Sequence, residues 1–223
     1  MFPLKDTQPS YSRPVVTIAL IAINLLVFLF EASLGSYTRN ALIEYYGLVP
    51  DHVRLSAVLT SMFLHGGWMH VLGNMWFLWI FGDNIEDLLG HAKFLVFYLL
   101  CGMVAALGQV IANPYSTIPM VGASGAIAGV MGAYLVKFPR ARIVTLVFVL
   151  FFITTIEIPA PLMLAYWFFI QLFSGFGSIA RTHVSESGTA FFAHIAGFVA
   201  GVVLVKVMGT SDVYNRRRDR YWE

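Results

Sequence analysis

The sequence is poor in charged residues and nearly devoid of cysteine. Only 12% of its 223 residues are Asp, Glu, Lys or Arg, whereas an ordinary soluble domain carries about 25%. The single cysteine, Cys101, excludes an internal disulfide and any metal site built from several thiolates. Hydrophobic residues make up 58% of the chain, which excludes a water-soluble globular domain. We therefore expect a polytopic helical membrane protein, since about 20 apolar residues suffice for one crossing.

Six apolar stretches are long enough for transmembrane helices. They are predicted at Val15–Phe30, Gly67–Leu89, Lys93–Ala112, Pro119–Phe138, Pro159–Ile179 and Thr189–Met208. The stretch from Leu34 to Gly67 is too polar to span and is predicted to fold onto the membrane surface. Residues 143–158 are apolar but short, which favours a buried or re-entrant segment. The predicted fold is all-α: a six-helix membrane bundle over residues 15–208.

Basic residues decide the orientation of this bundle. With six crossings, 11 of the 14 Lys and Arg residues fall on the side that holds both termini, and the other three are Arg39, Arg54 and Arg181. Cytoplasmic loops carry the excess of positive charge. Segment 1–14 and the basic tail 209–223 are therefore predicted to be cytoplasmic, and the protein is predicted to lie in a cell membrane. A seventh crossing, which would carry the tail outside, is rejected. So is a cleaved signal peptide, because no clear cleavage site follows the first stretch.

Two polar residues are predicted to lie at the same depth on the outer side. Ser124 stands in Gly122-Ala123-Ser124-Gly125 near the start of the fourth stretch, and His194 stands near the start of the sixth. These two helices run in the same direction, and each residue is placed on the order of 8 Å below the outer surface. A neutral imidazole is the usual base that activates a serine hydroxyl. The pair therefore indicates nucleophilic catalysis, although Ser124 alone fits helix packing and His194 alone fits a proton relay.

Small residues accompany this pair. They are predicted to let the fourth and sixth helices pack closely, and they are Gly125, Gly129, Gly132, Gly197 and Gly201.

A third polar group comprises His65, His70 and Asn74. His70 and Asn74 are four residues apart and share a helical face, so they are predicted to stabilise an oxyanion together with the Ser124 backbone N–H. Metal binding by His65 and His70 is the alternative, but their five-residue spacing places them on different faces of a helix. The prediction is a site without metal or other cofactor.

Two further sets of residues are given structural interpretations. The acidic cluster, Asp83, Glu86 and Asp87, is interpreted as a solvated or Arg-paired helix end, a membrane thickness away from Ser124. The tryptophans within predicted helices, Trp76, Trp79 and Trp167, are interpreted as lipid-facing or packing residues.

Taken in order, the three polar groups resemble the rhomboid family of intramembrane serine proteases. The matching residues are the H-x4-H-x3-N run of His65, His70 and Asn74, then Gly122-Ala-Ser124-Gly125, then Ala193-His194-x2-Gly197-x3-Gly201, and the resemblance covers the chain beyond about residue 15.

The resemblance implies a dyad of Ser124 and His194 without a third acid, an oxyanion hole with His70 and Asn74, and supporting roles for His65, Gly122 and Gly125. It also implies that the fifth helix and the loop after it admit the substrate. Some members carry a tyrosine four residues after the serine that stacks on the histidine. That position here is Ala128, which leaves open what orients His194.

The predicted function is hydrolysis of peptide bonds in or near transmembrane helices of membrane-protein substrates, at a site that opens to the outer side. The predicted partners are these substrates and the lipid bilayer, with no nucleic acid and no metal. One alternative is an inactive rhomboid-like protein that binds clients, against which the presence of both Ser124 and His194 argues. The other is a small proton or metal transporter. It would need polar residues in the inner halves of the fourth and sixth helices, where the sequence is apolar.

Overall fold

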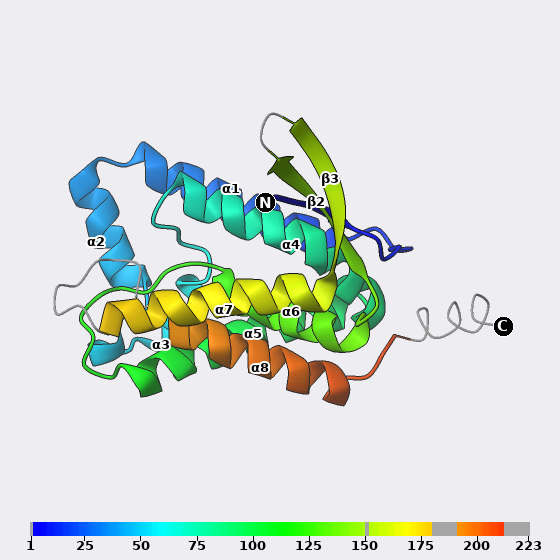
Figure 1. Ribbon diagram of the computed structural model, residues 1–223. Helices are drawn as coiled ribbons and strands as arrows, with labels where there is room; N and C mark the ends of the chain where they lie inside the picture. The colour runs from blue at the N-terminus through cyan, green and yellow to red at the C-terminus, as the bar shows by residue number, and fades with distance from the viewer. Residues whose placement is uncertain (1, 150–151, 180–190, 212–223) are drawn as a thin grey trace.

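The computed structural model describes residues 2–149, 152–179 and 191–211 (Figure 1). Its α-helices are α1 (Val15–Ser33), α2 (Ser36–Tyr46), α3 (Leu55–Thr60), α4 (Trp68–Leu89), α5 (His91–Ala112), α6 (Ser124–Lys137), α7 (Ala160–Ile179) and α8 (Phe191–Val207). A short 3-10 helix, η1, covers Pro50–His52, and the strands are β1 (Phe2–Asp6), β2 (Arg142–Val149) and β3 (Phe152–Pro159). Arg181 and the arginine-rich tail lie outside the described residues.

All six apolar stretches contain a helix, namely α1, α4, α5, α6, α7 and α8. Among the described residues, α1 and α5 have the length and the apolar composition needed to cross a membrane. Helices α6 and α8 and the first part of α7, residues 160–169, are shorter apolar helices. The fourth stretch differs at its start. Residues 119–123 are not helical but include a bridge between Met120 and Leu48, and α6 begins only at Ser124.

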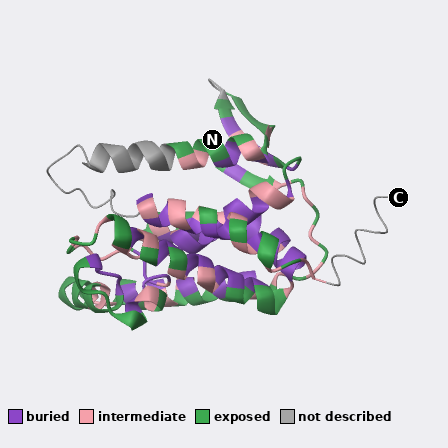
Figure 2. Cartoon of the chain, turned by 90° about the horizontal axis from the view of Figure 1, so that it is seen from below, coloured by how far each residue is buried: buried purple, intermediate pink, exposed green. Residues whose placement is uncertain are grey.

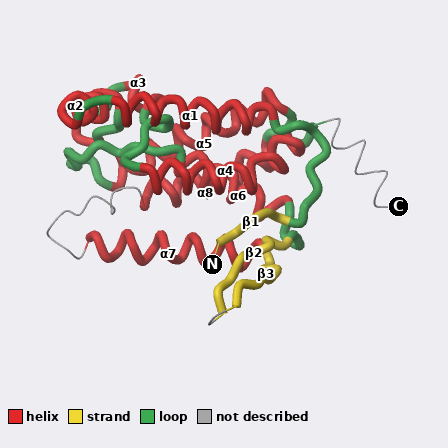
Figure 3. Tube along the Cα trace, turned by 90° about the horizontal axis from the view of Figure 1, so that it is seen from above, coloured by secondary structure: helices red, strands yellow, loops and turns green. Residues whose placement is uncertain are grey.

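Helix α6 forms the centre of the bundle and packs against α4, α5 and α8. Every residue from Gly125 to Tyr134 is buried. Its small residues explain this close packing. A Cβ atom added at Gly129 would lie 2.5 Å from Cys101 on α5, and one added at Gly132 would lie 2.3 Å from the Phe198 carbonyl oxygen on α8. Helix α7 is packed less closely, on the side of the bundle that also carries the sheet (Figure 3).

The fold is mostly helical rather than all-α, because the connection between α6 and α7, expected to be a buried or re-entrant segment, forms a β-hairpin. β2 pairs antiparallel with β3 on one side and with the N-terminal strand β1 on the other. β-branched residues such as Val147 and Ile153 are frequent in both segments and favour strands. Only one face of β2 is buried, through Ile143, Thr145 and Val147, while β3 is mostly exposed (Figure 2).

The sheet lies alongside α4 and is tied to the bundle through β1. The indole Nε1 of Trp76, in the middle of α4, donates a hydrogen bond to the Pro3 carbonyl over 2.6 Å. The buried Tyr134 hydroxyl of α6 donates to the Asp6 carboxylate. These contacts place the first residues of the chain against the middle of α4 and the last turn of α6.

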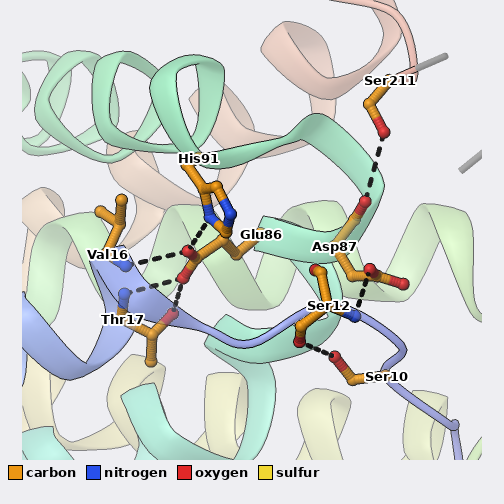
Figure 4. Close-up of polar contacts among 8 residues, drawn as sticks. All are labelled: Ser10, Ser12, Val16, Thr17, Glu86, Asp87, His91 and Ser211. Carbon is orange, nitrogen blue, oxygen red and sulfur yellow. Dashed lines mark hydrogen bonds and ion pairs between the residues drawn. The ribbon is translucent and has the colours of Figure 1, made fainter. Parts of the chain in front are cut away.

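Two residues of the acidic cluster at the end of α4, Glu86 and Asp87, are buried and accept hydrogen bonds from backbone N–H groups, whereas the sequence predicted a solvated or Arg-paired helix end. Glu86 is fully buried and accepts hydrogen bonds from the backbone N–H groups of Val16 (2.9 Å) and Thr17 (2.8 Å), while Asp87 accepts one from the Ser12 N–H (2.9 Å; Figure 4). A carboxylate at a helix N-terminus satisfies free N–H groups and opposes the positive end of the helix dipole. Glu86 therefore fixes the start of α1 on the end of α4.

Candidate active site

Ser124 and His194 lie together at the end of the bundle where α6 begins. Ser124 is the first residue of α6, and the Nε2 atom of His194, on α8, is 2.7 Å from its Oγ atom. His194 is 8% exposed. The depth argument from the sequence placed Ser124 one turn inside its helix, whereas it stands at the helix start. There the positive end of the α6 dipole favours negative charge near the hydroxyl.

Glycines on α6 and α8 set the distance between these two helices. A Cβ atom on Gly197 would lie 2.0 Å from the Gly125 carbonyl oxygen, and one on Gly201 would lie 1.9 Å from that of Gly129. Such distances are far below van der Waals contact, so only glycine permits the observed approach. Gly125 follows Ser124 directly, and Gly197 is three residues after His194. The packing therefore fixes the spacing of the two polar side chains.

His70 and Asn74 lie beside the segment that leads into Ser124. Gly122 has a φ of 126°, and a Cβ atom there would be 2.8 Å from the His70 ring and 3.5 Å from Nδ2 of Asn74. Within the described part of the chain, Nδ2 of Asn74 is buried and has no hydrogen-bond partner. An unpaired amide donor therefore lies next to the backbone of Gly122, two residues before Ser124.

His65 lies behind this group, in the segment before α4. Its backbone N–H donates to the buried Glu31 carboxylate of α1 over 3.2 Å, and Arg39 donates to its carbonyl oxygen over 3.3 Å. Burial, and secondarily the nearby His70, lowers the pKa of His65 to about 3, so its ring is neutral. Both ring nitrogens are buried and unpaired as far as the structure is described. His65 thus connects the start of α4 to α1.

A cavity of about 680 Å³ opens over the serine. Ser124, His194, His70 and Asn74 line it, together with apolar residues of α4 and α6 and with Trp167 of α7. A space of this size lies within the range of small-ligand sites. Across the described ranges, no group of three His, Cys, Asp or Glu side chains is arranged to hold a metal ion.

Two residues of the site were missed in the sequence, and a third was not assigned to it. Glu31 and Arg39 were not singled out, although an acidic residue that ends an apolar stretch is a functional signal in a membrane protein. Trp167 was interpreted as lipid-facing or packing, and it packs with its ring centroid 5.6 Å from that of His194, a contact with the site that was not predicted. No local pattern marks that contact, because it joins two helices. The loop after α7, expected to admit substrate, lies in residues 180–190, outside the described residues.

Comparison with known proteins identifies the family of this chain. The sequence matches the family model for the Rhomboid domain over residues 52–211. It is 36% identical over 129 residues to the mitochondrial presenilin-associated rhomboid-like protein of Homo sapiens, which covers 56% of this chain and 33% of that protein. It is 31% identical over 127 residues to the rhomboid protease GluP of Bacillus subtilis, covering 55% and 24% respectively. The matched region thus spans a third or less of these two relatives.

Proposed function

Because the chain belongs to the rhomboid family, we propose that it is an intramembrane serine endopeptidase in which Ser124 is the nucleophile and His194 the general base. The observation that carries this proposal is the 2.7 Å contact between Ser124 Oγ and His194 Nε2 on the wall of the cavity. A serine hydroxyl is a weak nucleophile until a neighbouring base accepts its proton. In the proposed reaction the Ser124 hydroxyl donates this hydrogen bond to Nε2 of a neutral His194, which meets that need.

The proposed reaction begins when Ser124 Oγ attacks the carbonyl carbon of the scissile bond and its proton passes to His194 Nε2. The new oxyanion accepts hydrogen bonds from Nδ2 of Asn74, from His70 and from the Ser124 N–H at the positive end of α6. The C–N bond then breaks, and the proton moves from His194 to the leaving amine. A water molecule hydrolyses the resulting acyl-enzyme by the same sequence of proton transfers.

We further propose that six helices, α1, α4, α5, α6, α7 and α8, cross the membrane with both termini in the cytoplasm. The support is the excess of Lys and Arg on the side of the termini. The cavity then opens to the outer side of a cell membrane. A transmembrane substrate hides its amides in helical hydrogen bonds, so cleavage is expected near the outer end of the substrate helix, at a small residue beside Gly, Pro or polar residues.

A fluorophosphonate probe tests the dyad without knowledge of the substrate. In detergent, the wild-type protein should be labelled, and both Ser124→Ala and His194→Ala should lose labelling while keeping their unfolding temperature. Ser36→Ala is the matched control, because Ser36 also begins a helix, α2, but is exposed. Labelling of Ser124→Ala at the wild-type rate would refute the mechanism. Failure of the folded wild-type protein to react, in lipid as well, would favour a client-binding or transport function.

A further inference from the structure

The cavity over Ser124 has an arginine on its wall. Among the described residues that line this cavity, only Arg39 of α2 bears a permanent charge, and the others are apolar, neutral polar or histidine. Helix α2 runs across the end of the bundle at which α1 ends (Figure 1). In the proposed topology this end faces the outer side. Arg39 therefore lies where a substrate helix would leave the membrane.

The guanidinium of Arg39 is fixed in place by specific contacts. Its Nη2 atom donates hydrogen bonds to the carbonyl oxygens of His65 (3.3 Å) and Gly66 (3.2 Å), and its Cζ atom lies 5.8 Å from the centre of the Phe28 ring. Helix α2 has no buried residue, so these contacts hold the side chain at the cavity. A side chain that is already held loses little conformational entropy when it binds a partner.

A buried carboxylate, that of Glu31 on α1, lies near this guanidinium. Both of its oxygens contact the His65 N–H, at 3.2 and 3.4 Å, and none of the ion pairs between described residues includes Arg39. An arginine has five N–H donors in a planar fork, and here Nη2 bonds to the two carbonyl oxygens. A carboxylate matches this fork by accepting two parallel hydrogen bonds. The remaining donors therefore suit a carboxylate of a bound substrate.

Arg39 also lies close to the group that is proposed to stabilise the oxyanion. It bonds to the Gly66 carbonyl, and a Cβ atom on Gly66 would lie 3.9 Å from Nδ1 of His70. Taken together, these contacts place the guanidinium within on the order of 10 Å of the His70 ring, the length of about three extended residues. An acidic side chain adds its own length to that of the backbone. A carboxylate within about five residues of the scissile bond can therefore reach Arg39.

We propose that Arg39 selects substrates that carry Asp or Glu within about five residues of the scissile bond, on the outer flank of the transmembrane helix. This inference rests on the proposed protease function and names a class of its substrates. Segments of membrane proteins on the outer side are poor in Lys and Arg, so most outer flanks bring no positive charge to Arg39. A substrate with Lys or Arg at that place is disfavoured by like-charge repulsion.

A matched pair of fluorophosphonates tests this selection without a transmembrane substrate. Each carries a flexible tether, in several lengths around about 10 Å, that ends in a carboxylate in one probe and in the corresponding neutral carboxamide in the other. In both reactions the Ser124 oxygen bonds to phosphorus, fluoride leaves, and His194 accepts the serine proton. A contact that is equally strong before and during the reaction changes binding and not the rate of the chemical step. In the wild-type protein the carboxylate probe should reach its half-maximal inactivation rate at a roughly tenfold lower concentration, which corresponds to about 1.4 kcal/mol.

Variants of Arg39 assign the preference to this residue, and comparing the two probes within one variant cancels any change in the dyad itself. Arg39→Gln should lose the preference. Arg39→Glu should reverse it, in favour of a probe whose tether ends in an ammonium group. Arg54→Gln is the matched control, because Arg54 also bonds to backbone carbonyls of the same outer segment, those of Glu44 and Tyr45 at 3.4 Å, but does not line the cavity. It should keep the wild-type preference.

Three results would overturn the inference: no preference for the carboxylate in the wild-type protein at any tether length, a preference that persists in Arg39→Gln or Arg39→Glu, or an equal loss in Arg54→Gln. Arg39→Met is a second neutral replacement in case the glutamine variant does not fold. Unfolding of both would assign Arg39 to stability and would also overturn it. The proposed function fails separately, since its failure would show as a wild-type protein that neither probe labels or as a labelled Ser124→Ala.

Discussion

The variant Gly197→Ala tests whether the close approach of α6 and α8 at Gly197 and Gly125 sets the geometry of the site. In Gly197→Ala the new Cβ atom would lie 2.0 Å from the Gly125 carbonyl oxygen, whereas ordinary contact begins at 3.4 Å. The obstacle is backbone within a helix, so no side chain can turn away to relieve it. Helices α6 and α8 would have to separate by about 1.4 Å at this point.

Two opposing free energies decide the effect of Gly197→Ala on stability. Alanine is favoured over glycine in a helix interior by about 1 kcal/mol. Overpacking in a close-packed interior costs about 1–3 kcal/mol and occasionally more, and a clash with backbone lies at the upper end. We expect a net loss of roughly 1–2 kcal/mol. A change of 1 kcal/mol corresponds to about 2–4 °C in a chain of this length, so the unfolding temperature should fall by several degrees.

The same separation should disrupt the dyad, because an increase of about 1.4 Å on the observed 2.7 Å would carry Ser124 Oγ and His194 Nε2 beyond hydrogen-bond distance. Fluorophosphonate labelling should therefore be lost at temperatures where Gly197→Ala is still folded. Gly73→Ala is the stability control, since a Cβ atom on that residue of α4 would meet nothing within 4 Å. Its unfolding temperature should be unchanged or higher. A Gly197→Ala variant with wild-type stability and labelling would refute this account of the packing.

Two further predictions concern the end of the bundle opposite the site. Glu86→Gln should lower the free energy of unfolding by about 1–3 kcal/mol, because buried N–H groups of α1 lose a charged acceptor; an unchanged unfolding temperature would contradict this role of Glu86. Burial raises the pKa of Asp6 from 3.8 to about 6, so the folded chain binds this proton more tightly than the unfolded chain. Stability from Asp6 is then full below pH 3.8 and is lost as the pH rises through about 6. Asp6→Asn should remove this part of the pH dependence of unfolding, and an identical pH profile in the variant would contradict it.

The positions of the helices could be predicted because hydrophobic stretches determine them. The predicted second helix, Gly67–Leu89, and the observed α4, Trp68–Leu89, differ by one residue. The start of α6 was placed five residues early, because Pro119 and Val121 read as a continuation of an apolar stretch. In the structure the Met120 backbone bonds instead to that of Leu48. That partner lies some 70 residues away, and no local pattern reveals it.

The sheet shows a different limit of prediction from sequence. Residues 143–158 were judged by length against a membrane crossing, and the many β-branched residues within them were given no weight. The partner of β2 on its other edge is β1, where Phe2 stands opposite Leu146. A pairing between residues more than 140 positions apart depends on the whole bundle being in place, so the local sequence of neither strand predicts it.

The burial of Glu86 was not predicted, for a related reason. Charged residues at the end of an apolar helix are usually solvated. The same local sequence can, however, face either water or another helix, so it does not distinguish the two. Glu86 is buried because the N-terminus of α1 reaches it with two unpaired N–H groups. The free N–H groups at the start of α1 need hydrogen-bond acceptors, and Glu86 of α4 provides them.

These long-range contacts bear on the site through α7. The Trp76 indole joins β1 to α4, β1 pairs with β2, and the hairpin that β2 begins leads directly into α7. Helix α7 in turn carries Trp167 to the ring of His194. A chain of contacts that starts at residues 2–6 thus ends on the base that the proposed reaction needs. The spacing of the dyad is set by glycines between α6 and α8, whereas the hairpin that leads into α7, and so places Trp167, was not predicted from the sequence.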